Sequence, residues 1–301
     1  MKHVPGYAKV LTLGSAYTEN ALMGEVILQE KVDGSQFGFG INEDGELVFR
    51  SHNQAIDYEA PNKMFSKVVD YLKSIEGKIK AYPKDTYFYC EYLSKPKHNT
   101  LCYDETPLNN LVLFDVQAPD GRWADRKYIE NIARYLEIDA IPELYRGIAN
   151  AETITNLLAT PSYLGNEIIE GIVIKNYNQT VLLNGKILPL ITKFVRPEFK
   201  EKHQCDWKIR SPKTCLADYV NSFCCEPRWQ KAIIHAKEQG NLSQSPKDIG
   251  MLIKMIQEDV LEEETEDIKQ RLFDFFKDDI LSKAIKGFPQ WYKEELLKNL
   301  N

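Results

Sequence analysis

Short apolar runs separated by turn residues fill the N-terminal two thirds of the chain, and this pattern is typical of β-strands. The runs that we predict to be strands cover residues 26–31, 37–41, 47–50, 86–93, 111–116, 168–175 and 188–195. Asn42-Glu43-Asp44-Gly45 and Asn184-Gly185 are turn sequences that predict β-hairpins between neighbouring runs. Residues 1–24 show little periodicity and are predicted to be loop and turn.

Apolar residues at helical spacing predict three helices in the same part of the chain, over residues 61–75, 125–137 and 152–158. Beyond Trp207 the strand pattern ends and helical spacing takes over. Ser245-Pro246 is a helix-start signal, and the buried face that follows is predicted to consist of Ile249, Leu252, Ile253, Ile256 and Val260. Two more helices are predicted over residues 265–285 and 289–300. The pattern therefore indicates an α+β protein, with an antiparallel-sheet domain (1–206) followed by a small all-helical C-terminal domain (207–301).

Composition is that of a globular chain: 301 residues, 43% apolar and 11% aromatic, enough for one large domain or two ordinary ones. No apolar stretch approaches the roughly 20 residues needed to cross a bilayer, and residues 1–6 lack the apolar segment of a signal peptide. We therefore expect an intracellular, cytoplasmic protein with no membrane contact. The six cysteines include no Cys-x-x-Cys pair and fit no standard zinc spacing, so reduced thiols are expected.

Charge is distributed unevenly along an acidic chain of net charge −6. Residues 186–213 carry eight basic and three acidic side chains, whereas residues 258–267 carry seven acids and no base. A net acidic protein does not coat nucleic acid indiscriminately, but a local basic strip suits a specific polyanion site. A solvated charged surface is the alternative interpretation of the same strip.

Charged residues also occur inside or at the ends of four predicted strands, where apolar side chains are the rule. They are Lys31 with Asp33, Glu91, Glu170 with Lys175, and Lys193. Taken one at a time, each is explained by a buried salt bridge or by a lysine that extends its charge to water. Lysine becomes a nucleophile only when burial, a nearby cation or a metal favours its neutral amine, because its free pKa is about 10.4. Lys31, at the end of an apolar strand, is the candidate for such a role.

Five short motifs in order along the chain resemble those of the covalent nucleotidyltransferases, the superfamily of ATP-dependent ligases and mRNA capping enzymes. The resemblance spans about residues 31–202 and is closest to RNA ligases of the bacteriophage RNA ligase 2 type. The motifs are Lys31-Val32-Asp33-Gly34, Tyr89-Cys90-Glu91-Tyr92, Leu113-Phe114-Asp115-Val116, Glu170-Gly171-Ile172-Val173-Ile174-Lys175, and Lys193-Phe194-Val195-Arg196-Pro197-Glu198-Phe199-Lys200-Glu201. Gln36 and Arg50 also fall where these RNA ligases carry an amide and an arginine. The resemblance implies an ATP-grasp-like ligase fold for the first domain.

The resemblance also implies a role for each residue. Lys31 is the expected nucleophile, which takes AMP from ATP through a P–N bond before the AMP passes to an RNA 5′-phosphate and a 3′-hydroxyl seals the strand. The expected nucleotide-binding residues are Glu30, Lys31, Gln36, Arg50, Glu91, Phe114, Lys175 and Lys193. Lys175, Lys193 and Arg50 are expected at phosphate oxygens, Phe114 on adenine, the Glu30 backbone at its amino group and Glu91 at the ribose. Glu170 and Asp33 are the expected ligands of Mg²⁺ or Mn²⁺.

The implied function is RNA repair by an ATP-dependent RNA ligase, with a nicked duplex or a broken strand as substrate; protein partners remain open. The helical C-terminal domain favours this over DNA ligases and capping enzymes, in which a β-rich OB domain follows the last motif. One departure is Val195, which stands where many relatives have a second lysine. Two alternatives therefore stay open: a ligase or adenylyltransferase with another acceptor, and a non-catalytic relic that binds nucleotide or RNA.

Overall fold

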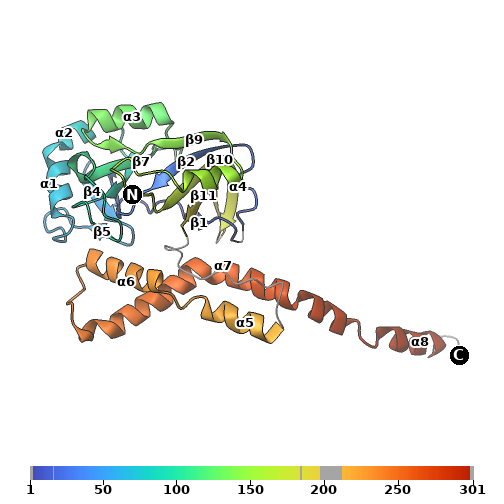
Figure 1. Cartoon of the computed structure of the whole chain (residues 1–301). Helices are drawn as coiled ribbons and strands as arrows, with labels where there is room; N and C mark the ends of the chain where they lie inside the picture. The colour runs from blue at the N-terminus through green and yellow to red at the C-terminus, as the bar shows by residue number, and fades with distance from the viewer. Residues whose placement is uncertain (1–2, 16, 184, 197–211, 299–301) are drawn as a thin grey trace. The chain divides into compact units, whose positions relative to one another are not determined.

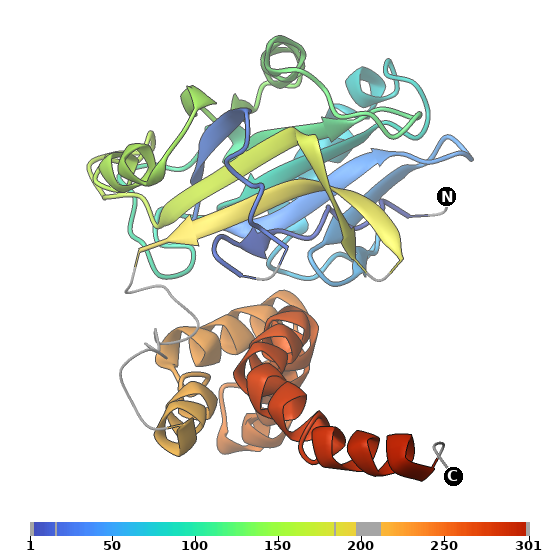
Figure 2. The same cartoon turned by 90° about the vertical axis from the view of Figure 1, so that its right-hand side faces the viewer.

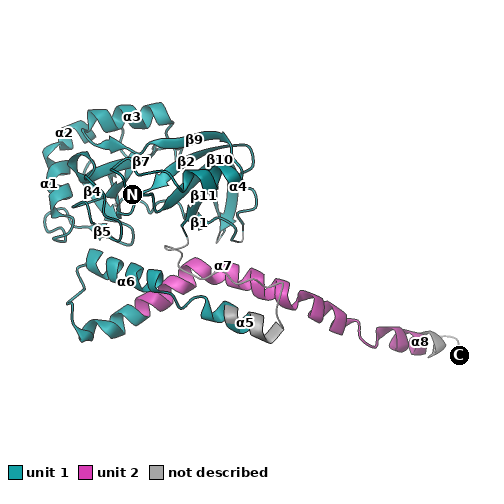
Figure 3. Cartoon of the chain, in the orientation of Figure 1, with its two compact units in different colours: residues 1–253 teal, residues 254–301 magenta. Residues whose placement is uncertain are grey.

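The computed structural model describes residues 3–15, 17–183, 185–196 and 212–298, which form a mixed α+β fold with two sheets and a helical C-terminal region (Figure 1). The chain divides into two compact units, residues 1–253 and 254–301 (Figure 3). The domain boundary predicted at residues 206/207 lies outside the described residues. None of the described helices is both long and apolar enough to span a bilayer.

Both sheets are mainly antiparallel, as the strand pattern predicts. The first has the order β1-β11-β10-β2-β9, formed by Leu11–Thr12, Lys186–Val195, Gly171–Leu183, Glu25–Lys31 and Glu143–Ile148. The second has the order β5-β4-β3-β6-β7-β8, formed by Ala55–Ile56, Leu47–Ser51, Ser35–Ile41, Tyr87–Tyr92, Leu111–Gln117 and Asp139–Ala140. Only the short edge strands β1 and β8 pair in parallel among the described residues.

Alternation along β3 separates a core face from a polar face. Phe37 and Phe39 are fully buried and pack with apolar residues of the helices α1 (Ser66–Ser74), α2 (Glu76–Ile79) and α3 (Arg126–Tyr135). These helices are seen around the β4–β7 side of the molecule in Figure 1. Gln36 and Gly38, which alternate with these phenylalanines along the strand, belong to the opposite face, because successive side chains of a strand point to opposite sides. The predicted helix at 61–75 begins later, at Ser66, since residues 61–65 are used as a turn and cap.

The other sheet has its own core, in which Val26 and Leu28 of β2 pack with Ile172 and Ile174 of β10 and with Ile154 of helix α4 (Ala151–Leu157). Strands β10 and β11 form the hairpin predicted at Asn184-Gly185, visible as the paired yellow-green and yellow strands of Figure 2. Its turn residue Asn184 lies outside the described residues. Strand β10 begins at Gly171 instead of residue 168 and continues to Leu183 instead of ending at 175. Strands β1 and β9 were not predicted from the sequence, because neither has a long apolar or alternating pattern.

The C-terminal region contains α5 (Pro212–Asn221), α6 (Glu226–Glu238), a short 3-10 turn at Pro246–Asp248, α7 (Ile249–Ala284) and α8 (Phe288–Lys298). Ser245 caps the 3-10 turn that leads into α7: its hydroxyl accepts from the Lys247 amide, and its own amide donates to the Asp248 carboxylate. The predicted break between residues 260 and 265 is wrong, because one continuous helix of 36 residues runs through it. The predicted buried face is also wrong at Ile249 and Ile253, which are 57% and 50% exposed; the apolar residues of α7 are spread around the helix instead of on one side.

Candidate active site

Lys31 and the other two predicted site lysines project from the same face of the first sheet. Gly171 of β10 lies directly opposite Lys31 of β2, and Val173 lies opposite Lys193 of β11. Because directly opposed residues share a face and every second residue along a strand returns to it, Lys31, Lys193 and Lys175 are on one side. Strand pairing thus brings together residues that are up to 162 positions apart in the sequence.

Two motif glycines are required by the close approach of neighbouring strands. A Cβ on Gly171 would lie 2.5 Å from the carbonyl oxygen of Phe194, and one on Gly34 would lie 2.8 Å from the carbonyl oxygen of Tyr92. Neither contact is sterically tolerable, so both positions need glycine. The atoms nearest to Gly34 belong to Glu91 and Tyr92 of β6 and to Leu93, which follows that strand.

The Lys31 amine forms an ion pair with Glu170, with 2.6 Å between Nζ and Oε2. The side chains are 28% and 10% exposed, so the pair is largely shielded yet reached by solvent. Burial alone lowers the pKa of Lys31, but the nearby carboxyls of Glu170, Asp33 and Glu91 outweigh it and raise that pKa above its ordinary value. The protein without a ligand therefore favours the ammonium, and attack requires a change of charge around Lys31.

Glu91 approaches Lys31 from the second sheet. It lies on β6, directly opposite Gln36 of β3. Burial raises the pKa of Glu91 to about 8, against the attraction of the Lys31 cation. Acidic groups of both sheets thus surround one amine, which supports the predicted convergence of Lys31, Glu91, Glu170 and Lys193; Lys193 acts electrostatically on Glu170.

Asp33, predicted as a metal ligand, is also used within the protein. Its Oδ2 accepts hydrogen bonds from the backbone amides of Thr100 and Leu101, each at 2.7 Å. Its own backbone amide donates to the Tyr103 hydroxyl at 2.8 Å. One carboxylate oxygen of Asp33 is therefore already committed to the loop that follows β6.

Phe114, predicted to stack on adenine, stands at an irregularity of β7. Tyr89 is opposite Asp115 while Cys90 is opposite Leu113, so Phe114 is the extra residue of a β-bulge. Its ring lies 5.4 Å from Nζ of Lys175. A bulge re-aims side chains, which explains how both Phe114 and Asp115 can approach the lysine face of the first sheet.

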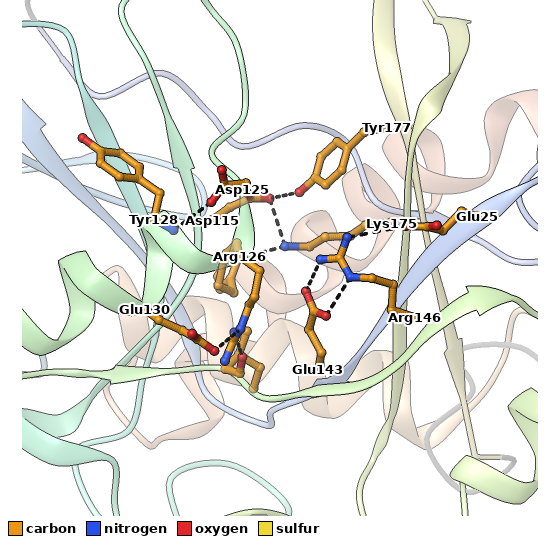
Figure 4. A network of polar contacts seen from close by, with 12 residues as sticks. Glu25, Asp115, Asp125, Arg126, Tyr128, Glu130, Glu143, Arg146, Lys175 and Tyr177 are labelled. Carbon is orange, nitrogen blue, oxygen red and sulfur yellow. Dashed lines mark hydrogen bonds and ion pairs between the residues drawn. The ribbon is translucent and has the colours of Figure 1, made fainter.

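Lys175 is held in a network of its own (Figure 4). Its Nζ donates to Oδ2 of Asp115 at 2.9 Å and to the Phe114 carbonyl at 2.7 Å, and the same Oδ2 accepts from the hydroxyls of Tyr7 and Tyr177. Lys175 is four strand positions from Gly171, the residue opposite Lys31, which corresponds to about 13 Å along the strand. Lys175 and Lys31 therefore share a face but occupy different neighbourhoods.

The remaining predicted nucleotide contacts lie at the edges of this region. The Glu30 carboxyl is buried and accepts from the Ser162 hydroxyl at 2.6 Å and the Tyr163 amide at 3.1 Å. Gln36 pairs through Oε1 with Nδ1 of His52 at 2.7 Å. Arg50 lies opposite Gly38, on the same face as Gln36, and its Nε has no hydrogen-bond partner among the described residues.

Val195, which replaces a second motif lysine, lies directly opposite Gly171 and is 9% exposed. It therefore stands in the same row of the sheet as Lys31, with only Gly171 between them. The basic strip falls mostly outside the described residues, as do residues 197–201 of the last motif.

The charged groups fit a metal that is shared with a nucleotide better than a protein-only metal site. Among the described residues there is no group of three or more His, Cys, Asp or Glu side chains arranged to hold a metal ion. Magnesium commonly uses only one or two carboxylates, with substrate phosphates and water as the other ligands. Glu170 satisfies that requirement, since it is a buried carboxylate beside the candidate nucleophile.

Several residues of the region were not assigned a role from the sequence. Asp115 could be noticed as an acid within a strand, but its partners Tyr7 and Tyr177 gave no signal. Tyr7 lies in the N-terminal segment that has no periodicity, and its hydroxyl donates to Asp115 at 2.6 Å. His98, Asn99 and Tyr103 were overlooked in the same way, because they lie in an irregular loop.

A family sequence model described as RNA ligase matches residues 24–194, from the start of β2 almost to the end of β11. No curated protein matches the chain significantly. Among solved structures, the chain is similar to Naegleria gruberi RNA ligase with PPi, at 16% identity and TM-score 0.47 over 65% of this chain and 60% of that chain. It is also similar to mutants of that ligase with ATP and Mn (17%, TM-score 0.49, 65% and 57%) and with AMP and Mn (17%, TM-score 0.49, 67% and 59%). The chain covers less than two thirds of the length of these solved ligases.

Proposed function

The chain belongs to the RNA ligase family, and on this premise we propose that it is an ATP-dependent RNA ligase of the bacteriophage RNA ligase 2 type. It joins RNA 5′-phosphate and 3′-hydroxyl ends through a lysyl-AMP intermediate and an RNA-adenylate, in the repair of a nicked duplex or broken strand. The observation that carries the proposal is the Lys31–Glu170 pair, in which a lysine at a strand end meets acids from two sheets. Residues 1–206 form an ATP-grasp-like nucleotidyltransferase domain and residues 207–301 a helical domain.

In the first step the neutral amine of Lys31 attacks the α-phosphorus of ATP, and pyrophosphate leaves as the P–N bond forms. The amine must first lose a proton, which passes to solvent, because solvent reaches the Lys31–Glu170 pair and Glu170 is assigned to the metal. When bound, Mg²⁺ or Mn²⁺ supplies positive charge that favours the neutral amine and balances the phosphate charge.

The other residues bind and orient the nucleotide. Lys193 shares the Lys31 face and supplies a cation for the α-phosphate oxygens, and Arg50 binds a phosphate from the second sheet. Phe114 stacks on adenine, the Glu30 carbonyl faces its amino group, and Glu91 binds the ribose. Gln36 and Asp33 complete the set, with Asp33 assisting Glu170 at the metal. The position of Lys175 at the α-phosphate, implied by the motif, stays a prediction. Its contact with the Phe114 ring instead favours a place on the adenine side of the site.

Adenylation in the absence of RNA tests the first step directly. The protein is incubated with ATP labelled at the α-phosphate and a divalent cation, and an acid-labile protein–AMP adduct is measured. We expect an adduct in the wild type and in Lys78→Ala, a control that removes another lysine–glutamate pair, between Lys78 of α2 and Glu137. We expect none in Lys31→Ala. A wild type that forms no adduct favours the relic over the ligase.

The acceptor is tested in a second step with the adenylated protein. Nicked RNA duplex, nicked DNA duplex and single-stranded RNA are offered, and sealed product and released AMP are measured. The proposal requires sealing of RNA ends. A preference for nicks made only of DNA contradicts it and favours the alternative of a DNA ligase.

A further inference from the structure

The loop of residues 94–103, which follows β6, binds three consecutive residues after Lys31. The Asp33 amide donates to the Tyr103 hydroxyl at 2.8 Å, and Asp33 Oδ2 accepts from the Thr100 and Leu101 amides at 2.7 Å each. Asn99 Nδ2 donates to the Gly34 carbonyl at 2.6 Å. His98 Nε2 is bonded to the Ser35 hydroxyl at 2.9 Å. Polar groups of the loop and of residues 33–35 are thus hydrogen-bonded to each other. Such a dense set of bonds fixes the turn more firmly than packing alone.

The bond partners of His98 define its tautomer. The Ser94 backbone amide can only donate, and it donates to Nδ1 of His98 at 3.0 Å, so Nδ1 carries no proton. Nε2 must then carry the proton and donate it to the Ser35 hydroxyl. His98 is 4% exposed and burial lowers its pKa to about 4, in keeping with a fixed neutral imidazole.

This turn connects the two sheets. Lys31 is the last residue of β2 in the first sheet, and Ser35 is the first residue of β3 in the second, so only three residues span the gap. The loop starts directly after β6, the strand that carries Glu91. A displacement of the turn therefore changes the position of Lys31 relative to the acids of both sheets.

We propose that the 94–103 loop is a splint that sets the position of Lys31, with Asn99, His98 and Tyr103 as positioning residues and Asp33 as their acceptor. The inference rests on the proposed function, since it takes Lys31 as the nucleophile. A reacting group must be held within a fraction of an ångström, and a misplacement of about 1 Å can cost roughly 100-fold in rate. Loss of a splint bond therefore lowers the rate of adenylation more than the affinity for ATP.

The test compares two tyrosine variants that lose the same atom. Tyr103→Phe removes the hydroxyl that accepts from Asp33, whereas Tyr71→Phe removes a hydroxyl that donates to the Leu136 carbonyl at 2.6 Å, in the helix packing around α1 and α3. Asn99→Ala is the second splint variant. The measured quantities are the rate of adduct formation at saturating ATP, the KM for ATP, the final adduct per protein and the thermal midpoint.

We expect Tyr103→Phe and Asn99→Ala to lower the saturating rate about 10-fold or more, with KM changed less than about 3-fold and the final adduct preserved. Tyr71→Phe keeps the wild-type rate. Dividing the rate by the final adduct removes any contribution of unfolded protein. Splint variants that match Tyr71→Phe in saturating rate, or that change KM alone, overturn the proposal.

A readout without ATP separates this inference from the proposed function. Amide hydrogen exchange followed by mass spectrometry reports how firmly the turn is held, because hydrogen-bonded amides exchange slowly. We expect faster exchange in the peptide that contains Lys31 to Ser35 in Asn99→Ala, while Tyr71→Phe keeps the wild-type exchange there. If the wild type forms no adduct but Asn99→Ala speeds this exchange, the ligase proposal fails and the splint stands. Unchanged exchange in an active enzyme rejects the splint alone.

Discussion

Lys31 and Lys175 are two lysines on one face of one sheet, each paired with a single carboxylate, yet their surroundings differ. The Lys31–Glu170 pair is 28% and 10% exposed, whereas the Lys175–Asp115 pair is 3% and 0% exposed. Burial lowers the pKa of Lys175 despite Asp115, while several acids raise the pKa of Lys31. By pKa alone Lys175 resembles the better nucleophile, but its amine is enclosed by Asp115 and Phe114. Access and the neighbouring acids distinguish the proposed nucleophile Lys31 from the enclosed Lys175.

The largest expected difference between the two lysines is in the formation of the protein–AMP adduct. Lys31→Ala removes the only atom proposed to bond to phosphorus, so adduct formation falls below detection, a loss of at least about 1,000-fold. A Lys175→Met protein that remains folded keeps measurable adduct formation, because its lysine is not the nucleophile. Radiolabel transfer from ATP checks both. Adduct formation that survives in Lys31→Ala and is lost in folded Lys175→Met reverses the assignment.

The free energy of unfolding is expected to fall more in the Lys175 variant than in the Lys31 variant, the reverse of the order expected for adduct formation. Lys175→Met leaves Asp115 buried without its cation, which costs about 3–5 kcal/mol in the free energy of unfolding. Lys31→Met costs less, about 1–2 kcal/mol, since its pair reaches solvent and Glu170 can take up a proton. Urea unfolding monitored by circular dichroism measures both values. Equal losses contradict the distinction between an enclosed Lys175 pair and a solvent-reached Lys31 pair.

A smaller effect is expected from the donors around Asp115. Tyr7→Phe removes one of the three hydrogen bonds to Oδ2 and is expected to cost about 2 kcal/mol, the size of a bond to a charged group. The rate of adduct formation at Lys31 stays within about 3-fold of wild type if the two neighbourhoods are independent. A large fall in rate at unchanged stability shows that Tyr7 acts on the reaction instead.

A pH dependence of the free energy of unfolding is expected on the Lys31 side. The folded-state pKa of Glu91 is about 8, above its value of about 4.3 in the unfolded chain, so the folded protein binds more protons between these values. Stability therefore declines as pH rises from 5 to 8, and Glu91→Gln removes this part of the decline. Urea unfolding at several pH values gives the two slopes. Parallel slopes mean that Glu91 is ionised at neutral pH in the folded protein.

Periodicity predicted the elements with long apolar patterns and failed where tertiary contacts decide. The runs that became β2, β6, β7 and β11 are strongly apolar, and their ends were found within about three residues. Strand β9 was missed because its residues are only half-buried or exposed. The sequence prediction divided helix α7 between residues 260 and 265, whereas the acidic residues 258–267 continue the helix.

The candidate site was predictable as a set of residues but not as a network. Charged residues on predicted apolar strands pointed to Lys31, Glu91, Glu170 and Lys193. Strand pairing places Lys31 and Lys193 on one face, Glu170 contacts Lys31, and Glu91 acts on Lys31 from the second sheet. The separation of Lys175 from Lys31 follows from strand register, which is fixed by pairing and not visible in one strand's sequence. The contacts of Asp33 depend on loop backbone amides, and no side-chain pattern reports those.

Mapping the AMP attachment site tests the central claim most directly. The protein is incubated with ATP and a divalent cation, digested at neutral to alkaline pH and analysed by tandem mass spectrometry. The account predicts one AMP per chain, on the peptide that contains Lys31, with the peptide of Lys175 unmodified. AMP on another residue, or no AMP at saturating ATP, contradicts the assignment of Lys31 as the nucleophile.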